Sequence, residues 1–168
     1  MTVQILAAEL VRLLRGQGQH VTTVESCTGG LIAGAITSVP GSSEVFDYGF
    51  VTYSNAAKTK LVAVPEALLA EHGAVSEPVA AAMAEGGLLA SGAGIAISVT
   101  GIAGPGGGTA EKPVGMVWFG LSRRSGGQVV TQTQVMQFGD IGRDAVREAT
   151  LAHALTWAAD ALKAHAAS

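Results

Sequence analysis

The sequence has one cysteine and few charged residues, and each scarcity excludes a class of protein. Because Cys27 is the only cysteine in 168 residues, no disulfide can form within the chain, and no Cys/His cluster has the spacing of a zinc site. Charged residues make up 14% of the chain and the formal net charge is -3, so the broad basic surface that binds nucleic acid non-specifically is missing. We therefore expect neither a metal nor a nucleic-acid partner.

Long apolar runs are also missing, although 48% of the residues are hydrophobic. No uninterrupted run approaches the roughly 20 residues that a membrane span needs. The N-terminal segment is amphipathic and carries Glu9, unlike a secretory signal. The length suits one domain with a substantial core. The sequence thus predicts a single cytoplasmic domain over residues 1–168, without membrane contact.

Helical and β-branched segments alternate along the chain, which indicates the α/β class. Strands are predicted at 20–25, 46–54, 94–100, 114–121 and 128–137. Helices are predicted at 3–14, 29–38, 55–61, 65–71, 77–91 and 140–163. The run at 94–100 is continuously apolar, as expected of a strand buried on both faces, and 122–127 is expected to close a hairpin. These elements predict a three-layer α/β/α domain with a mixed five-stranded sheet.

The segment 25–30 (ESCTGG) joins a predicted strand to a predicted helix. At such a corner, free backbone N–H groups can bind an anion or a developing oxyanion, and Ser26 could act as a nucleophile. Alternatively, Ser26 or Thr28 caps the helix. Cys27 could likewise be a thiolate of lowered pKa or a buried apolar filler. The corner alone does not decide between these interpretations.

A tyrosine and a lysine follow the aromatic strand in the segment YSNAAK. If a helix begins near Asn55, Lys58 lies one turn in, on a face close to Tyr53. A lysine serves as a general base only where desolvation or a neighbouring cation lowers its pKa from about 10.4. Lys60 would point elsewhere. Lys58 is therefore a candidate base, with an ordinary surface lysine as the alternative.

A glycine-rich loop, Thr100–Gly108, follows the buried strand. Its five glycines allow backbone N–H groups to approach a phosphate or carboxamide closely. The loop lacks the Gly-Lys-Ser/Thr ending of a Walker loop, and its spacing does not fit the dinucleotide-binding fingerprint. It is a candidate ligand-binding loop, and a flexible hairpin connection is the alternative.

The last predicted helix opens with two arginines, Arg143 and Arg147. Cations at a helix start are disfavoured by the helix dipole unless an acid or an anionic ligand offsets them. Asp140, as the cap, and Asp144 could supply that offset. Alternatively, Arg143 contacts a phosphate.

Several blocks in one order resemble the C-terminal domain of the competence-damage-inducible CinA family: VESCTGG, PGSS, GFVTYSNAAK, GAVSEPVA, SVTGIAGPGGGTAEKPVG and GDIGRDAVR. The resemblance runs from about residue 4 to residue 162. Stand-alone members of that family are nicotinamide-nucleotide amidohydrolases, and we expect this chain to be of the free-standing form. The resemblance implies hydrolysis of the carboxamide of nicotinamide mononucleotide to nicotinic acid mononucleotide and ammonia, within pyridine-nucleotide recycling.

The resemblance also implies the catalytic residues. It assigns the nucleophile to Ser26 and the assisting pair to Tyr53 and Lys58. We expect neutral Lys58 to accept the proton of Ser26, while Tyr53 hydrogen-bonds this pair and relays the proton to ammonia. No metal or cofactor is needed. The expected substrate-binding residues are Cys27, Thr28, Gly29, Gly30, Asn55, Thr100, Gly101, Gly104 and Arg143, with Arg147 as the alternative phosphate contact.

Two other functions fit the same residues. The chain could be a nucleotide-binding regulatory domain without catalysis, or an amidase that acts on another small amide. Family members are typically oligomeric, so we expect a homo-oligomer whose other partner is a small mononucleotide.

Overall fold

The computed structural model describes all 168 residues, and their elements follow in the predicted order. The helices are α1 (Val3–Gln17), α2 (Leu31–Thr37), α3 (Asn55–Val62), α4 (Glu66–His72), α5 (Glu77–Ser91) and α6 (Arg143–Ala166), with a short 3-10 turn, η1 (Ser42–Glu44). The strands are β1 (Val21–Glu25), β2 (Phe46–Val51), β3 (Ile95–Gly101), β4 (Met116–Ser125) and β5 (Gln128–Gln137). None of these helices combines the length and the apolar character that a membrane span requires.

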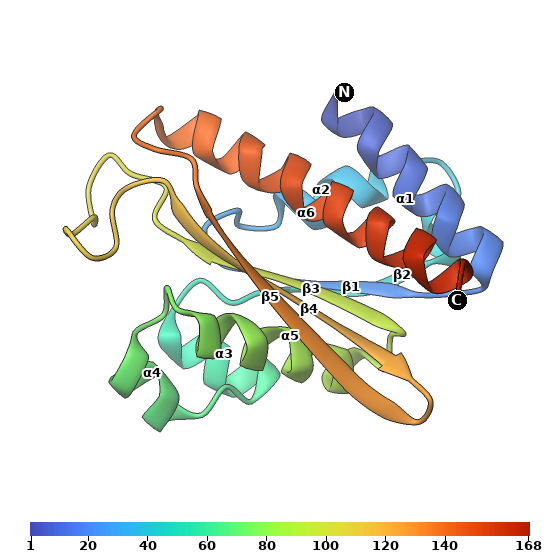
Figure 1. Ribbon diagram of the computed structural model, residues 1–168, viewed down its shortest axis with the longest axis horizontal. Coiled ribbons are helices and arrows are strands. Elements are labelled where there is room, and N and C mark those ends of the chain that lie inside the picture. Colours follow the sequence, from blue (N-terminus) through green and yellow to red (C-terminus); the bar gives the residue numbers. More distant parts are fainter.

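The five strands form one mixed sheet in the order β2-β1-β3-β4-β5. β1 pairs in parallel with both β2 and β3, whereas β3/β4 and β4/β5 are antiparallel pairs. Helices cover both faces: α1, α2 and α6 lie on one side of the sheet, and α3, α4 and α5 lie on the other (Figure 1). The predicted three-layer α/β/α architecture with a mixed five-stranded sheet is confirmed.

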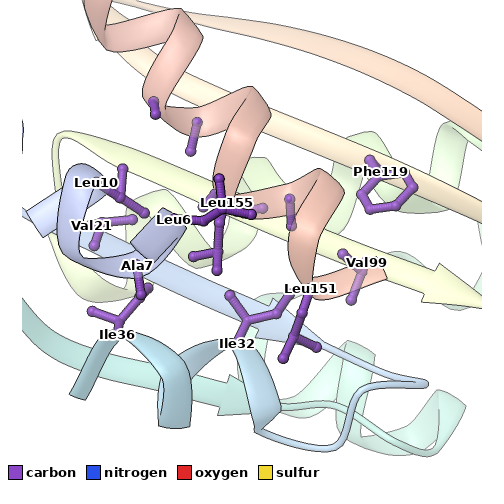
Figure 2. Close-up of a cluster of buried hydrophobic side chains, with 14 of the residues drawn as sticks. Leu6, Ala7, Leu10, Val21, Ile32, Ile36, Val99, Phe119, Leu151 and Leu155 are labelled. Atoms are coloured by element: carbon purple, nitrogen blue, oxygen red, sulfur yellow. The ribbon is translucent and has the colours of Figure 1, made fainter. Parts of the chain in front are cut away.

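The larger hydrophobic core lies between the sheet and α1, α2 and α6. Ile32 of α2 and Leu151 and Leu155 of α6 meet there, with Val99 of β3 and Phe119 of β4 reaching the same layer (Figure 2). Burial of such side chains stabilises the fold by about 1.5–3 kcal/mol each. This layer fixes α2 and α6 against the sheet, and both helices begin at the site described below.

On the opposite face, two glycines of α5 allow very close packing. A Cβ atom on Gly86 would overlap the carbonyl oxygen of Val62, the last residue of α3, and one on Gly87 would overlap the Val24 side chain of β1. The absence of side chains at Gly86 and Gly87 thus lets α5 hold α3 in place beneath the sheet. α3 carries Lys58.

Several predicted boundaries differ from the structure, and three of the differences have a clear local cause. The segment expected as the hairpin connection, 122–127, is mostly strand, because Gly126 and Gly127 alone form the turn with φ of 58° and 78°. α1 continues through Gly16 and ends at Gln17, followed by the C-cap Gly18, whose φ is 61°. β2 ends at Val51, before Ser54, because Ser54 caps α3 by accepting from the Ala57 N–H.

Candidate active site

The topology brings several predicted site residues to one edge of the sheet. Because β2, β1 and β3 run parallel, their carboxyl ends share that edge: Ser26 follows β1, Thr52 follows β2, and Gly101 ends β3. From β1 the chain continues to β2 on one side of β1 and later to β3 on its other side. The edge of the sheet at this point is a topological switch point, where open α/β sheets bind ligands. β5 runs in the same direction as β3, so α6 also begins at this edge.

Lys58 and Ser26 meet beneath this edge. Lys58 Nζ donates to the Thr52 carbonyl oxygen at 2.8 Å and lies 3.2 Å from Ser26 Oγ, within hydrogen-bond distance. Lys58 is 1% exposed, and no carboxylate pairs with it. Burial lowers the pKa of the Lys58 amine because removal from water disfavours the charged form. The alternative of an ordinary surface lysine is therefore excluded, and the arrangement places an amine of lowered pKa against a hydroxyl.

A buried carboxylate, which no sequence motif pointed to, supports the serine corner. Glu25 is 1% exposed, and its oxygens accept from Thr28 Oγ1 at 2.7 Å, the Ile32 N–H at 2.8 Å and the Ala33 N–H at 3.0 Å. The predicted caps, Ser26 and Thr28, are wrong: Gly30 occupies the N-cap position with φ of 102° and offers no side chain. A sequence signal did exist, since Glu25 ends a buried strand just before a helix with no acidic residue in its first turn.

Not every N–H group of the corner is free. The Ser26 N–H donates to the Val99 carbonyl, and the Gly29 N–H donates to the Ser26 carbonyl, each at 3.1 Å. By contrast, the N–H groups of Cys27, Thr28 and Gly30 have no acceptor within the chain. Of the predicted donors at 27–30, Gly29 is thus already engaged and the others are available to a ligand.

The thiol of Cys27 packs into the core. Cys27 is 6% exposed and belongs to the large hydrophobic cluster. Desolvation raises the pKa of its thiol to about 11, so the thiol is protonated at neutral pH. Of the two interpretations of Cys27, the structure favours the apolar filler.

Tyr53 lies at the surface and contacts an arginine instead of the lysine. It is 62% exposed, and its hydroxyl accepts from Arg143 Nη2 at 3.1 Å. Arg143 Nη1 also donates to the Gly104 carbonyl at 2.9 Å. The structure has no hydrogen bond from Tyr53 to Ser26 or Lys58, because the phenol follows β2 outward while Lys58 turns inward from α3. Arg143 therefore joins Tyr53 to the glycine loop.

The other arginine of α6 contacts the serine corner. Arg147 Nε donates to the Cys27 carbonyl at 3.2 Å, and its Nη2 donates to the Thr28 carbonyl at 3.4 Å. Arg147 also lies 4.0 Å from Asp144. Asp140 is not the cap of α6, because the helix begins only at Arg143, with Gly142 at the N-cap position.

The remaining predicted binding residues are more scattered. Thr100 is buried, and its hydroxyl donates to the Ala74 carbonyl at 2.9 Å. Asn55 lines a separate hollow of about 350 Å³ between α3 and α4. The largest hollow, about 620 Å³, lies beside the outer part of the glycine loop, and its lining includes neither Ser26 nor Lys58. Nowhere do three or more His, Cys, Asp or Glu side chains gather as a metal ion would require.

The fold and this site define a class: a three-layer α/β/α protein with a serine–lysine pair at the switch point of a mixed sheet. The sequence model described as the CinA C-terminal domain matches residues 3–162. The chain belongs to the CinA C-terminal domain family.

Individual relatives agree with that assignment. The chain is 57% identical over 150 residues to a putative competence-damage inducible protein of Symbiobacterium thermophilum, covering 86% of this chain and 35% of that longer protein. It is 50% identical over 150 residues to the nicotinamide-nucleotide amidohydrolase PncC of Escherichia coli (strain K12), covering 89% of this chain and 88% of that protein. Among solved structures, the competence/damage inducible protein CihA of Agrobacterium tumefaciens matches with a TM-score of 0.88 and 48% identity, over 96% of this chain and 95% of that one.

Proposed function

We propose that this chain hydrolyses the carboxamide of nicotinamide mononucleotide, releasing ammonia and nicotinic acid mononucleotide, as a step of pyridine-nucleotide recycling. The observation that carries the proposal is the pair formed by Ser26 Oγ and buried Lys58 Nζ, 3.2 Å apart. The name of the Escherichia coli relative, which this chain spans almost completely, supports the substrate class.

The first half of the reaction acylates Ser26. Lys58 is neutral in a larger share of molecules than an exposed lysine, because burial lowers its pKa. The neutral amine accepts the Ser26 proton as Oγ attacks the carboxamide carbon, and the resulting ammonium keeps its hydrogen bond to the Thr52 carbonyl. The C–N bond then breaks, and the departing nitrogen takes up the proton from the Lys58 ammonium. Ammonia is released, and the acyl group stays bound to Ser26 as an ester.

The negative charge on the carboxamide oxygen needs donors during both addition steps. The free N–H groups of Cys27, Thr28 and Gly30 suit that role, since they lie beside Ser26 and have no internal acceptor. Loss of a single such donor typically costs about 100- to 1000-fold in kcat.

Tyr53 assists from the mouth of the site. Its hydroxyl oxygen accepts from Arg143, which leaves its own O–H free to donate a hydrogen bond to the substrate, while the Lys58 ammonium protonates the departing nitrogen. In the second half of the reaction, neutral Lys58 takes a proton from water as the water oxygen attacks the ester. Ser26 then recovers its proton from Lys58, and the carboxylate product leaves.

The substrate carries a cationic ring at one end and a phosphate at the other, and the charges of the site fit both. The N–H groups of the corner are neutral donors, so they place no full cation against the pyridinium ring. Arg143 is exposed and uses two of its donors on Gly104 and Tyr53, which leaves donors for a phosphate. We propose Arg143 as the phosphate contact in preference to Arg147, whose guanidinium binds the corner.

The test is ammonia release by the wild type, by Ser26→Ala and by Ser43→Ala, an exposed serine that serves as the matched control. We expect nicotinamide mononucleotide to be deamidated by the wild type and Ser43→Ala, and not by Ser26→Ala. Nicotinamide riboside and free nicotinamide test for another amide substrate. If folded wild type binds the mononucleotide without releasing ammonia, the chain is a nucleotide-binding domain without this activity, and the proposal is wrong.

We also propose that the chain forms a homo-oligomer in the cytoplasm. Light scattering coupled to size exclusion measures the assembly, and cell fractionation measures the location. A monomer at micromolar concentration would contradict the first statement, and recovery in the membrane fraction would contradict the second.

A further inference from the structure

Glu25 is a buried titratable group to which the mechanism above gives no role. It immediately precedes the proposed nucleophile, and each of its oxygens is hydrogen-bonded: Oε1 accepts from Thr28 and Ile32, and Oε2 accepts from Ala33. Hydrogen bonds to a buried carboxylate are among the stronger ones in proteins. Glu25 therefore ties the end of β1, the corner and the start of α2 into one unit.

These bonds determine which N–H groups of the corner stay free. The first turn of a helix leaves N–H groups without partners, and at α2 the Glu25 carboxylate accepts from Ile32 and Ala33. A substrate oxygen therefore finds its free donors in the turn, at Cys27, Thr28 and Gly30, and not in the helix. The shape of this turn decides whether an oxyanion is stabilised.

Arg147 holds the same turn from the other side. It donates to the carbonyl oxygens of Cys27 and Thr28. Since the C=O and N–H of a planar trans peptide point in opposite directions, fixing the Cys27 carbonyl toward Arg147 directs the free Thr28 N–H away from it. The hydroxyl of Thr28 is held by Glu25, so this residue is constrained at both its backbone and its side chain.

We propose that Glu25 is a positioning residue of the reaction: its carboxylate holds the turn at 27–30 in the shape that presents free N–H groups to the carboxamide oxygen. The inference rests on the proposed amide hydrolysis and adds a residue to it. Glu25 accepts no proton from Ser26, because no hydrogen bond joins them and both of its oxygens are engaged elsewhere.

A positioning role predicts a specific kinetic signature. Glu25→Gln keeps the length of the side chain and one acceptor oxygen, but its NH2 group replaces the oxygen that faces the Ala33 N–H. The turn then loses one of its three anchors, and Glu25→Ala removes all of them. We expect kcat for nicotinamide mononucleotide to fall roughly 10- to 100-fold in Glu25→Gln and further in Glu25→Ala. The fall in Glu25→Gln should not exceed that caused by the loss of one oxyanion donor. We expect KM to change less than threefold, because the donors act chiefly in the transition state.

The control is Ile36→Val, which removes one buried methyl group from the far end of α2. Both variants are assayed at a temperature where circular dichroism shows them folded. Ile36→Val lowers the melting temperature and keeps the wild-type kcat, whereas Glu25→Gln loses kcat at a comparable melting temperature. The pH of half-maximal rate should match the wild type in Glu25→Gln, because Glu25 transfers no proton. If Glu25→Gln does not fold, Arg147→Gln tests the same turn from a half-buried position and should show the same loss of kcat.

The outcomes separate this inference from the proposed function. Wild-type turnover together with an unchanged kcat in Glu25→Gln, or in its substitute Arg147→Gln, overturns the positioning role and leaves the hydrolysis standing. A shifted pH of half-maximal rate also overturns it, in favour of direct proton transfer. No turnover by the wild type overturns the proposed function, and the inference with it.

Discussion

Lys58 Nζ lies 3.2 Å from Ser26 Oγ although 32 residues separate the two in the chain. The distance results from the parallel pairing of β1 and β2, which places the end of β1 beside the loop that leads into α3. The lysine side chain extends from α3 into the protein interior. Its only polar partners are the Thr52 carbonyl oxygen and the Ser26 hydroxyl.

Removal of the amine should abolish most of the activity. Lys58→Met keeps the apolar stem and removes the proposed base, so we expect kcat to fall by about 100- to 10,000-fold, the usual contribution of a general base. Lys60→Met, an exposed position on the same helix, is the control and should retain wild-type turnover. Equal activity in both variants would exclude Lys58 as the base.

The pH dependence of the rate follows from the lowered pKa of Lys58. Only the neutral amine accepts a proton, so kcat/KM should rise as the pH rises through the pKa of Lys58 and then level off. Because burial lowers that pKa, the plateau begins below the usual range for lysine. Ammonia release measured between pH 5.5 and 10 tests this, and a flat profile across that range would be incompatible with a lysine base.

The thiol of Cys27 should be unreactive in the folded protein. Its burial raises the pKa to about 11, so little thiolate exists at pH 7.5. We expect iodoacetamide to modify Cys27 slowly under native conditions and rapidly in denaturant, with activity unchanged after native treatment. Mass spectrometry measures the extent of modification. Fast native alkylation with parallel loss of activity would point to a cysteine nucleophile instead of Ser26.

Two glycine substitutions should have opposite effects on stability, because only one of the two glycines lies at the close contact between α5 and α3. Gly86→Ala places a methyl group on the Val62 carbonyl, and we expect a loss of about 1–3 kcal/mol in the free energy of unfolding. Gly16→Ala, in α1, meets no atom within 4 Å and should stabilise the protein by about 0.5–1 kcal/mol. Urea unfolding gives both values. A neutral Gly86→Ala would show that α3 can shift without cost.

His153 should make the protein less stable in acid. Burial lowers the pKa of its imidazole, which packs against Phe119 and hydrogen-bonds Gln134. The unfolded chain therefore binds the proton more readily, so this contribution is present above the unfolded pKa of about 6.5 and is lost as the pH falls toward the folded value. We expect the melting temperature to drop between pH 7.5 and 5, and to drop less in His153→Gln. An equal drop in both proteins would assign the effect to other groups.

Much of the fold could be predicted because its signals are local. The β-branched runs and the helical periodicity placed the helices and strands in the correct order, and the apolar run at 94–100 matched a central strand with Ile95–Thr100 buried. The errors fell where a glycine pair or a helix cap set a boundary. Such boundaries depend on the φ of one or two residues, which hydrophobic periodicity does not encode.

The site was predicted less completely, because its contacts join distant segments. Ser26 and Lys58 were placed from motifs and from the family resemblance. The partners of Glu25, Arg143 and Arg147 depend on how α2, α6 and the glycine loop pack, which no local pattern reveals. The catalytic roles of Ser26 and Lys58 stay predictions that the variants above will test, and the role of Tyr53 stays a prediction.

The two arginines of α6 have a consequence for the synthesis of the protein. Arg143 and Arg147 bind the glycine loop, Tyr53 and the serine corner, all of which precede them by at least 39 residues in the chain. A nascent chain can therefore pair β1, β2 and β3 before these arginine contacts exist. The turn at 27–30 gains its hydrogen bonds from Arg147 only after the start of α6 has left the ribosome. Activity should therefore appear only after the start of α6 is free to pack against these segments.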